Sequence, residues 1–401
     1  MSTSLLYHAF GLKGYRHKRT LFEGGAVIFE VEAVRLCCPV CRSFDVTRRG
    51  THRRSRRTLP IGGKAVFLSQ HAPRVQRRRC GAVRHMEVRF AEPYVTYSRA
   101  FARYALELSR LTTMKDAADH LGVGWDLIKD IQKRDLQRRF LRPPLSHLRR
   151  IAIDEIAVKK GRKYLTVVLD LDSGVAVFVG DGKGAEALEP FFKRLKRTRA
   201  KIKAVAMDMS AAYIAAVSKH LPSAAIVFDR FHVVKLMNEK LSDLRRQLQR
   251  EADALGKKLL KGTRWLLMKN PENLDEAQGE RKKLDEALTF NQPLAEAYYM
   301  KEELRLFWEQ PDKNTAQRFL DQWLEWAWAS ETKILRDMAN TLAGRRWGLL
   351  SYYDHPISTG PLEGTNNKIK TMKRQAYGYR DMEFFKLKIL ALHESKFALV
   401  G

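Results

Sequence analysis

The stretch from residue 148 to residue 228 constrains the fold most, because short apolar segments alternate there with amphipathic ones. Its first part predicts three strands that follow one another through short turns, at residues 151–158, 164–171 and 175–179. Helices are then expected at residues 185–195 and 211–220, and further strands at residues 202–207 and 224–228. Strands that first meander and then alternate with helices indicate a mixed sheet with helices on its faces.

The order of these elements is that of an RNase H-like domain, so the expected fold class is α/β. Residues 231–350 are rich in charge and in tryptophan, and we interpret them as an all-helical insertion that interrupts the mixed-sheet domain. We expect the tryptophans of this insertion to form helical core rather than a platform for stacked bases. The sheet domain then consists of residues 146–230 and 351–401, on either side of the insertion.

The charge of the chain indicates the class of its partner. There are 74 Lys and Arg residues against 45 Asp and Glu residues, a net charge of +29, and such an excess favours a polyanion. Residues 42–89 hold fourteen cations and two acids, but they lack the apolar residues at helical spacing that binding to anionic lipid requires. No apolar run approaches the roughly 20 residues that span a bilayer. We therefore expect double-stranded DNA as the partner, and no membrane.

The cysteines indicate the redox compartment. All four precede residue 81 and do not form a disulfide framework, and the first residues lack the pattern of a secretory signal. We therefore expect a cytoplasmic protein that is associated with the nucleoid.

Residues 1–95 are expected to form a basic, zinc-finger-like module. The run Cys38-Pro-Val-Cys41 has the two-residue spacing that brings two thiolates to one tetrahedral zinc ion. The second half is incomplete, because Arg77 stands where another Cys-x-x-Cys pair would begin, and either a histidine or Cys37 would have to complete the set. The candidate zinc ligands are Cys38, Cys41, Cys80 and His85. The alternative is a β-rich module without metal, or buried structural thiols.

Residues 96–145 predict a helix-turn-helix. A short amphipathic helix at residues 114–121 is followed by the turn Gly122-Val123-Gly124 and by a second helix at residues 125–138. Small residues near the turn let two such helices cross closely. The second helix has a cationic outer side, where we expect DNA contacts from Lys129, Lys133 and Arg134. The pair Pro143-Pro144 marks a linker to the next domain.

Residues 360–374 predict a helix that carries one carboxylate, two amides and four cations. Its Gly-Pro start suits a helix cap and first turn. Glu363 and Asn367 share a face of this helix, because residues three or four apart are neighbours. An acid beside phosphate-binding groups would repel a nucleic acid unless a cation lay between them. The cations expected to contact phosphates are Lys368, Lys370, Lys373 and Arg374.

Three acids on different elements are the candidate catalytic residues. Asp154 lies in the first predicted strand, Asp208 ends the fourth, and Glu363 begins the late helix. Carboxylates packed together raise each other's pKa unless cations are bound, and Mg²⁺ prefers oxygen ligands of this kind. Two Mg²⁺ ions would activate the attacking oxygen and stabilise the leaving one in a displacement at phosphorus. Structural explanations exist too: Asp208 as a helix cap, Glu363 at a helix dipole, and Asp154 with a partner in the sheet.

Four motifs, in this order, resemble the DDE transposases of bacterial insertion sequences, and the ISL3 group in particular. They are Asp154-Glu155-x-Ala157-x-Lys159-Lys160-Gly161, Asp208-Met-Ser-x-x-Tyr213, Phe228-Asp229-Arg230-Phe231-His232 and Thr359-Gly360-Pro361-x-Glu363-Gly364-x-Asn366-Asn367-x-Ile369-Lys370. The resemblance implies an RNase H-like nuclease, preceded by a zinc-finger-like module and a helix-turn-helix. Such an enzyme cuts transposon ends and joins the freed 3′-hydroxyl to target DNA.

The resemblance also implies roles for individual residues. Asp154, Asp208 and Glu363 would be the metal-binding triad, with two Mg²⁺ ions at the catalytic site and a structural Zn²⁺ as a second candidate metal. Asp229, His232 and Asn367 are expected to support the site, although a helix cap with a satisfied histidine explains the first two equally well. Joining two transposon ends implies a homodimer or a higher oligomer on DNA.

Two other functions fit parts of the sequence. A DNA-binding repressor or architectural protein would use the helix-turn-helix and the basic module, with the acids in structural roles. A late glutamate helix brought beside Asp154 argues against it. A tyrosine recombinase would explain His71 and Arg74, but both lie in the N-terminal module, far from any suitable tyrosine helix.

Overall fold

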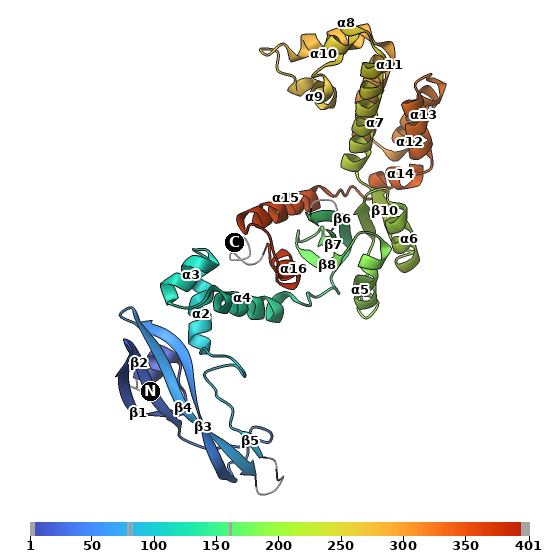
Figure 1. The fold of residues 1–401 in the computed structure, drawn as a ribbon. Helices are drawn as coiled ribbons and strands as arrows, with labels where there is room; N and C mark the ends of the chain where they lie inside the picture. The colour runs from blue at the N-terminus through green and yellow to red at the C-terminus, as the bar shows by residue number, and fades with distance from the viewer. Residues whose placement is uncertain (1–4, 78–80, 82, 160–162, 394–401) are drawn as a thin grey trace. The chain divides into compact units, whose positions relative to one another are not determined.

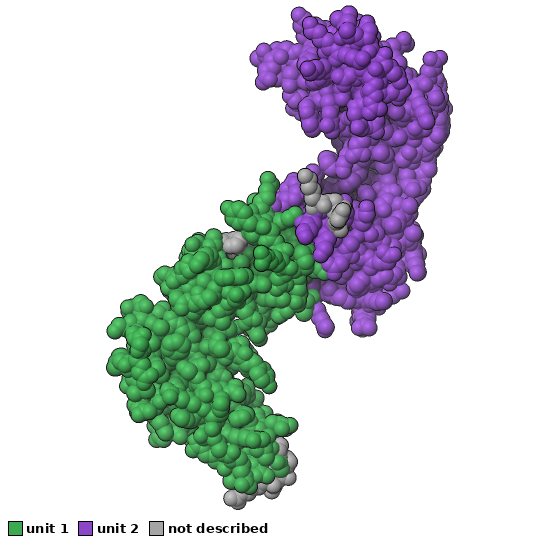
Figure 2. Space-filling view, viewed as in Figure 1, with its two compact units in different colours: residues 1–141, 371–401 green, residues 142–370 purple. Residues whose placement is uncertain are grey.

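The computed structural model describes residues 5–77, 81, 83–159 and 163–393 (Figure 1). The chain forms two compact units, which Figure 2 shows in different colours. Unit 1 contains residues 1–141 and 371–401, and unit 2 contains residues 142–370. The division into five parts that the sequence suggests remains a prediction. None of the described helices combines the length and apolarity needed to cross a bilayer.

The N-terminal part of unit 1 is a five-stranded sheet. After helix α1 (Leu5–Phe10) come strands β1 (Tyr15–Glu23), β2 (Ala26–Ala33), β3 (Val46–Ile61), β4 (Lys64–Arg77) and β5 (Val83–His85). The strand order is β1-β2-β4-β3, and β5 pairs with β4. β2 and β4 are parallel, and the other pairs are antiparallel. In Figure 1, β3 and β4 form a long ribbon that reaches β5.

Paired glycines set the two hairpins of this sheet. Gly24-Gly25 joins β1 to β2 and Gly62-Gly63 joins β3 to β4, and all four glycines have φ between 55° and 78°. A two-residue turn of this kind needs positive φ at both positions, which glycine adopts at little cost. The residues that the structure describes here therefore form a β-rich module, whereas zinc binding stays a prediction.

The predicted helix-turn-helix is present in unit 1. Helix α2 (Arg99–Leu108) precedes α3 (Met114–Leu121) and α4 (Trp125–Phe140), and the late helix α16 (Met382–Leu390) packs against α4. Thr113 and Asp116 form a capping box that fixes the start of α3. Gly122 ends α3 with φ of 62°, so the turn falls where the sequence predicted it. Phe101, Ala118 and Ile128 bury their side chains in one core with the N-terminal sheet.

Unit 2 begins with the predicted mixed sheet. Its strands are β6 (Arg150–Lys159), β7 (Lys163–Asp170), β8 (Ala176–Asp181), β9 (Ala204–Met207) and β10 (Ala225–Phe228), with helices α5 (Ala185–Leu195) and α6 (Ala211–His220) between them. The strand order is β10-β9-β6-β7-β8. β6, β9 and β10 are parallel, whereas β6, β7 and β8 form an antiparallel meander. The first strand, β6, is therefore central, and the fourth, β9, lies beside it.

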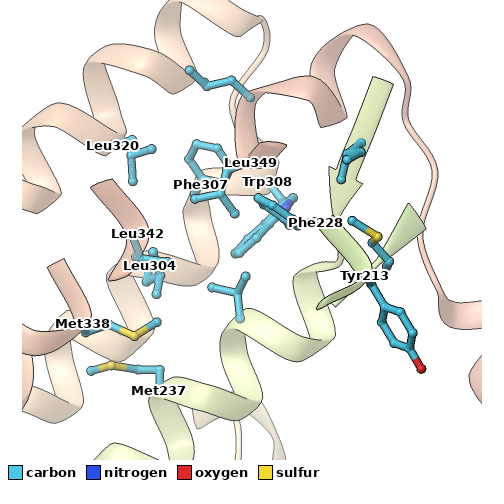
Figure 3. Packing of buried hydrophobic residues seen from close by; sticks show 14 of the residues in the cluster. Tyr213, Phe228, Met237, Leu304, Phe307, Trp308, Leu320, Met338, Leu342 and Leu349 are labelled. Carbon is cyan, nitrogen blue, oxygen red and sulfur yellow. The ribbon is translucent and has the colours of Figure 1, made fainter. Parts of the chain in front are cut away.

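Helices follow the sheet, and the described residues 230–393 contain no strand. These helices are α7 (Arg230–Glu251), α8 (Ala254–Leu260), α9 (Arg264–Met268), η1 (Pro271–Asn273), α10 (Glu280–Phe290), α11 (Gln292–Arg305), η2 (Leu306–Glu309), α12 (Lys313–Ala329), α13 (Lys333–Ala343), α14 (Arg346–Asp354) and α15 (Gly360–Gln375). Their core is continuous with that of the sheet, since Phe228 of β10 lies among Trp308 and Leu349 in Figure 3.

The tryptophans of the helical region only partly form core. Trp308 and Trp323 are buried. The other four retain 45% to 65% exposure; they are Trp265, Trp326, Trp328 and Trp347. The prediction of a tryptophan core is therefore right for two of the six and wrong for four.

Candidate active site

Three aspartates lie at one level of the mixed sheet. The parallel register pairs Ala152 with Ala206 on β9, so a continuation by two residues places Asp154 level with Asp208. Asp229 follows β10, whose last residue pairs with Met207, and its N–H donates to the Met207 carbonyl over 3.1 Å. Asp229 therefore lies at the same level. The register thus brings Asp229 to the level of the two aspartates that the sequence singled out as catalytic candidates.

Asp154 contacts two side chains from other elements of the site. Its Oδ2 accepts a hydrogen bond of 2.8 Å from Nδ2 of Asn366, and its Oδ1 lies 3.8 Å from Nε2 of His232. Burial raises the pKa of Asp154 above its ordinary value, and the negative charges of Asp208 and Asp229 act in the same direction. A carboxylate held beside like charges favours a bound cation, because a cation lowers the free energy of its ionised form.

Asp229 connects two segments that are distant in the sequence. Its Oδ2 accepts a hydrogen bond of 3.0 Å from the Phe231 N–H, which makes it the N-cap of α7, and lies 3.3 Å from Nδ1 of His232. Its Oδ1 accepts a bond of 2.8 Å from the Thr359 N–H, directly before α15. Burial acts to raise the pKa of Asp229, but the bonds from His232 and Thr359 outweigh it and lower the pKa. Asp229 is therefore a helix cap and also a contact of the site.

Glu363 lies in the first turn of α15 and is half-buried. Asn366, three residues later, bonds to Asp154, and residues three apart share a helix face. That face of α15 therefore lies against β6. Oδ1 of Asn366 is buried and has no hydrogen-bond partner among the described residues. The next residue, Asn367, which the sequence suggested as the supporting amide, is exposed.

The side chains of the three predicted triad residues do not form a preformed metal site. In the part of the chain that the structure describes, no group of three or more His, Cys, Asp or Glu side chains is placed to hold a metal ion. Asp208 instead accepts a bond of 2.9 Å from the Ser210 N–H, before α6. Ser210 rather than Asp208 occupies the N-cap position of that helix.

The predicted DNA-binding cations fall into two classes. On α4, Nζ of Lys129 and of Lys133 lie 3.2 and 3.1 Å from Oδ2 of Asp381, and Lys133 also lies 2.8 Å from Oε2 of Glu383. Arg134 pairs with Asp130 on its own helix at 2.7 Å. On α15, none of the four predicted cations makes an ion pair with a described residue; they are Lys368, Lys370, Lys373 and Arg374.

The candidate zinc ligands start in a tight turn. The Arg42 N–H donates to the Cys38 carbonyl over 2.9 Å, the Cys38 N–H donates to the Ser43 carbonyl over 2.8 Å, and Arg42 has a φ of 61°. Cys38 is buried and Cys41 is exposed. His85 ends β5, while Cys80 lies outside the described residues.

Comparison with known proteins defines the class of the protein. A transposase profile of the DDE type from family ISL3 matches residues 151–389, and the helix-turn-helix profile of transposase family ISL3 matches residues 86–135. The first match covers the mixed sheet, the helical region, all of α15 and most of α16. The matches show that the protein is a DDE transposase, an enzyme that cleaves and transfers DNA strands.

Two full-length relatives define the family. The transposase for insertion sequence element IS1001 of Bordetella parapertussis is 35% identical over 361 residues, which are 88% of this chain and 87% of that protein. The transposase for insertion sequence element IS1557 of Mycobacterium tuberculosis is 30% identical over 389 residues, 89% of this chain and 86% of that protein. The chain belongs to the ISL3 family of insertion-sequence transposases.

One solved structure shares a distant likeness. The Drosophila P element transposase strand transfer complex aligns with 76% of this chain and 94% of that chain, at 11% identity and a TM-score of 0.39. A likeness at this level adds nothing to the assignment of the site.

Proposed function

We propose that Asp154, Asp208 and Glu363 hold the divalent cations, two Mg²⁺ ions, of this transposase. Three features of the described residues fit a cation there: the level register of the acids, the raised pKa of Asp154, and the orphaned buried oxygen of Asn366. When bound, such ions activate the attacking oxygen and stabilise the leaving one. The carboxylates of these residues would supply the oxygen ligands that Mg²⁺ prefers.

The neighbouring side chains position the acids. The Asn366 amide holds Oδ2 of Asp154 in one orientation, and the same bond fixes α15 against β6. Asp229 accepts a hydrogen bond from the Thr359 N–H, four residues before Glu363, and so fixes the start of α15. His232 bridges Asp229 and Asp154. Asn366, Asp229 and His232 are thus positioning residues, and Asn367 stays a candidate of the same kind.

The finer fold assignment follows from the sheet. We infer an RNase H-like domain, because a central first strand, a parallel fourth strand beside it and an acid on each are the arrangement that such a domain requires. The DNA partners are then the terminal repeats of the insertion sequence and its target DNA. A homodimer or a higher oligomer binds them, in the cytoplasm and in association with the nucleoid.

A structural zinc ion is a separate proposal for the N-terminal sheet. The turn around Cys38 and Cys41 supports it, because two peptide N–H bonds hold the first cysteine in place. Cys80 and His85 would complete a tetrahedral set. Zinc released per chain on treatment with a thiol-blocking mercurial tests this proposal, with Cys41→Ser as the variant. Absence of bound zinc in the parent protein overturns it.

Strand cleavage tests the metal triad. The substrate is a duplex that carries the element's own ends, and the cation is Mg²⁺. We expect Asp154→Ala and Glu363→Ala to lose cleavage by at least about 100-fold, because even groups one shell away from a metal are worth 10 to 100-fold. End binding should persist in both variants. Glu325→Ala, an exposed acid on α12, is the matched control and should cleave like the parent.

Asn366→Ala separates positioning from ligation. It should lose cleavage by roughly 10 to 100-fold, with partial recovery in Asn366→Gln, which keeps the amide. Full cleavage by Asp154→Ala would refute the triad. Loss of end binding together with cleavage would favour structural acids, as in a repressor or architectural protein.

A further inference from the structure

The far end of the long hairpin in unit 1 is strongly basic. Between Val46 and Arg77 the chain has nine Lys and Arg residues and no Asp or Glu. Residues 46–55 of β3 and 69–76 of β4, here named the arginine ribbon, carry most of this charge. Its arginines are Arg48, Arg49, Arg53, Arg54 and Arg74.

The β3 side of the arginine ribbon is open on both of its faces. Every residue from Thr47 to Arg53 is exposed, whereas a strand that packs on one face would alternate between buried and exposed positions. β3 is also the edge of its sheet, because in the described residues it pairs with β4 and otherwise makes one isolated bridge from Arg57 to Tyr97. Side chains and backbone are therefore both accessible to a large partner.

The arginines of the ribbon are largely free of acidic partners. Arg48, Arg54 and Arg74 make no ion pair with any residue that the structure describes. Arg49 bonds to the neutral Oε1 of Gln76 at 2.7 Å. Arg53 is the exception, since its Nη2 lies 3.6 Å from Oε1 of Glu30. Unpaired guanidinium groups in water keep their full charge for a polyanion.

The lysines of α4 provide the contrast within the same unit. Lys129 and Lys133 share Asp381, and Lys133 also pairs with Glu383. Their charges are compensated inside the chain. The arginine ribbon therefore holds more uncompensated charge than this lysine pair.

We propose that the arginine ribbon is a second DNA-binding surface of this transposase, which contacts the phosphates of a duplex beside the site bound by the helix-turn-helix. The surface offered to the duplex is the exposed edge strand β3, because β4 is also paired with β2 at residues 69–70 and with β5 at residues 74–76; arginines on such an edge suit contacts to phosphates. The open stretch from Thr47 to Ser55 has nine residues, or roughly 30 Å at about 3.3 Å per residue, close to one turn of duplex. Its exposed side chains are Thr, Arg, His and Ser, with no apolar group to insert into a lipid bilayer.

Binding to duplex DNA in EDTA tests the proposal. The probes are a fluorescein-labelled 40-base-pair duplex with the element's own end, and a second of mixed sequence. The variant is Arg48→Gln, Arg54→Gln and Arg74→Gln combined in the full chain. The control variant combines Arg110→Gln, Arg246→Gln and Arg281→Gln, which removes the same charge at exposed arginines paired with Glu107, Asp243 and Glu276. Without metal, the assignment of the catalytic acids does not enter the measurement.

The salt dependence gives the sharpest readout. Each lost phosphate contact lowers the slope of log K against log salt by about 0.9, so the ribbon variant should have a slope smaller by about 2 to 3 and an affinity lower by about tenfold or more at 0.1 M salt. The loss of affinity should be similar for both duplexes, because phosphates carry no sequence information. A ribbon variant that binds both duplexes like the control variant overturns the proposal. Unchanged duplex affinity with lost binding to phosphatidylserine vesicles also overturns it, in favour of a lipid surface.

Discussion

Gly348 of α14 offers a quantitative test of how the helical region is joined to the sheet. A Cβ added at this position would lie 2.3 Å from Cε2 and 2.5 Å from Cδ2 of Phe228. Carbon atoms prefer about 3.5 to 4.0 Å, so the ring or the helix must move. Phe228 is completely buried and lies against Trp347 with ring centroids 5.1 Å apart. The ring therefore has no free space to move into.

The size of the effect follows from two opposing terms. Overpacking of a close-packed core costs about 1 to 3 kcal/mol, while alanine gains about 1 kcal/mol over glycine inside a helix. We therefore expect Gly348→Ala to lower the free energy of unfolding by up to about 2 kcal/mol. Gly364 in α15 is the matched control, because nothing lies within 4 Å of its added Cβ. Gly364→Ala should therefore raise the free energy of unfolding by up to about 1 kcal/mol.

Urea denaturation followed by far-ultraviolet circular dichroism measures both variants against the parent. The two midpoints should move in opposite directions. If Gly348→Ala is as stable as Gly364→Ala, the close approach of α14 to β10 does not exist in solution and the reasoning is refuted.

Two further predictions concern α16. Burial lowers the pKa of Lys388 to about 8, so Lys388→Met should raise the free energy of unfolding at pH 7 by up to about 3 kcal/mol. This gain should disappear as the pH rises from 8 to 10.5, because in that range only the unfolded parent still binds the proton. Although partial burial opposes it, the Phe384 N–H, Lys133 and Lys129 hold the pKa of Asp381 at about 2. Asp381→Asn should lower the free energy of unfolding by about 1 kcal/mol at pH 7 after screening. In urea denaturation, the difference between parent and variant should disappear as the pH falls from about 4 to 2. A difference that does not change with pH would contradict the ion pairs.

The mixed sheet of unit 2 was predictable because the sequence pattern of each strand and helix is local. Helix α5 begins and ends at the predicted residues, and the strands differ from prediction by one or two residues. Short apolar runs mark its strands, and apolar residues at helical spacing mark its helices, so each segment carries this information by itself. The level of Asp154 with Asp208 then follows from strand order alone.

The N-terminal sheet and the amide contact were harder to predict for two different reasons. β3 exposes every residue from Thr47 to Arg53, so it lacks the alternation that marks a half-buried strand. Asn366 and Asn367 both lie within reach of Glu363 by helical spacing, and only the packing of α15 on β6 selects Asn366. Lys133 and Asp381 are 248 residues apart, a pairing that no sequence periodicity encodes.

The free edge formed by β3 has a consequence for the protein before it meets any duplex. An unpaired strand edge is a template onto which another polypeptide can add, and natural sheets discourage this with charge and irregular register. β3 has both, since its arginines repel a second copy and its pairing with β4 shifts between Arg48 and Thr51. Removing the guanidinium groups should therefore increase self-association. The solubility of the new chain and its proposed binding to DNA thus depend on the same few side chains.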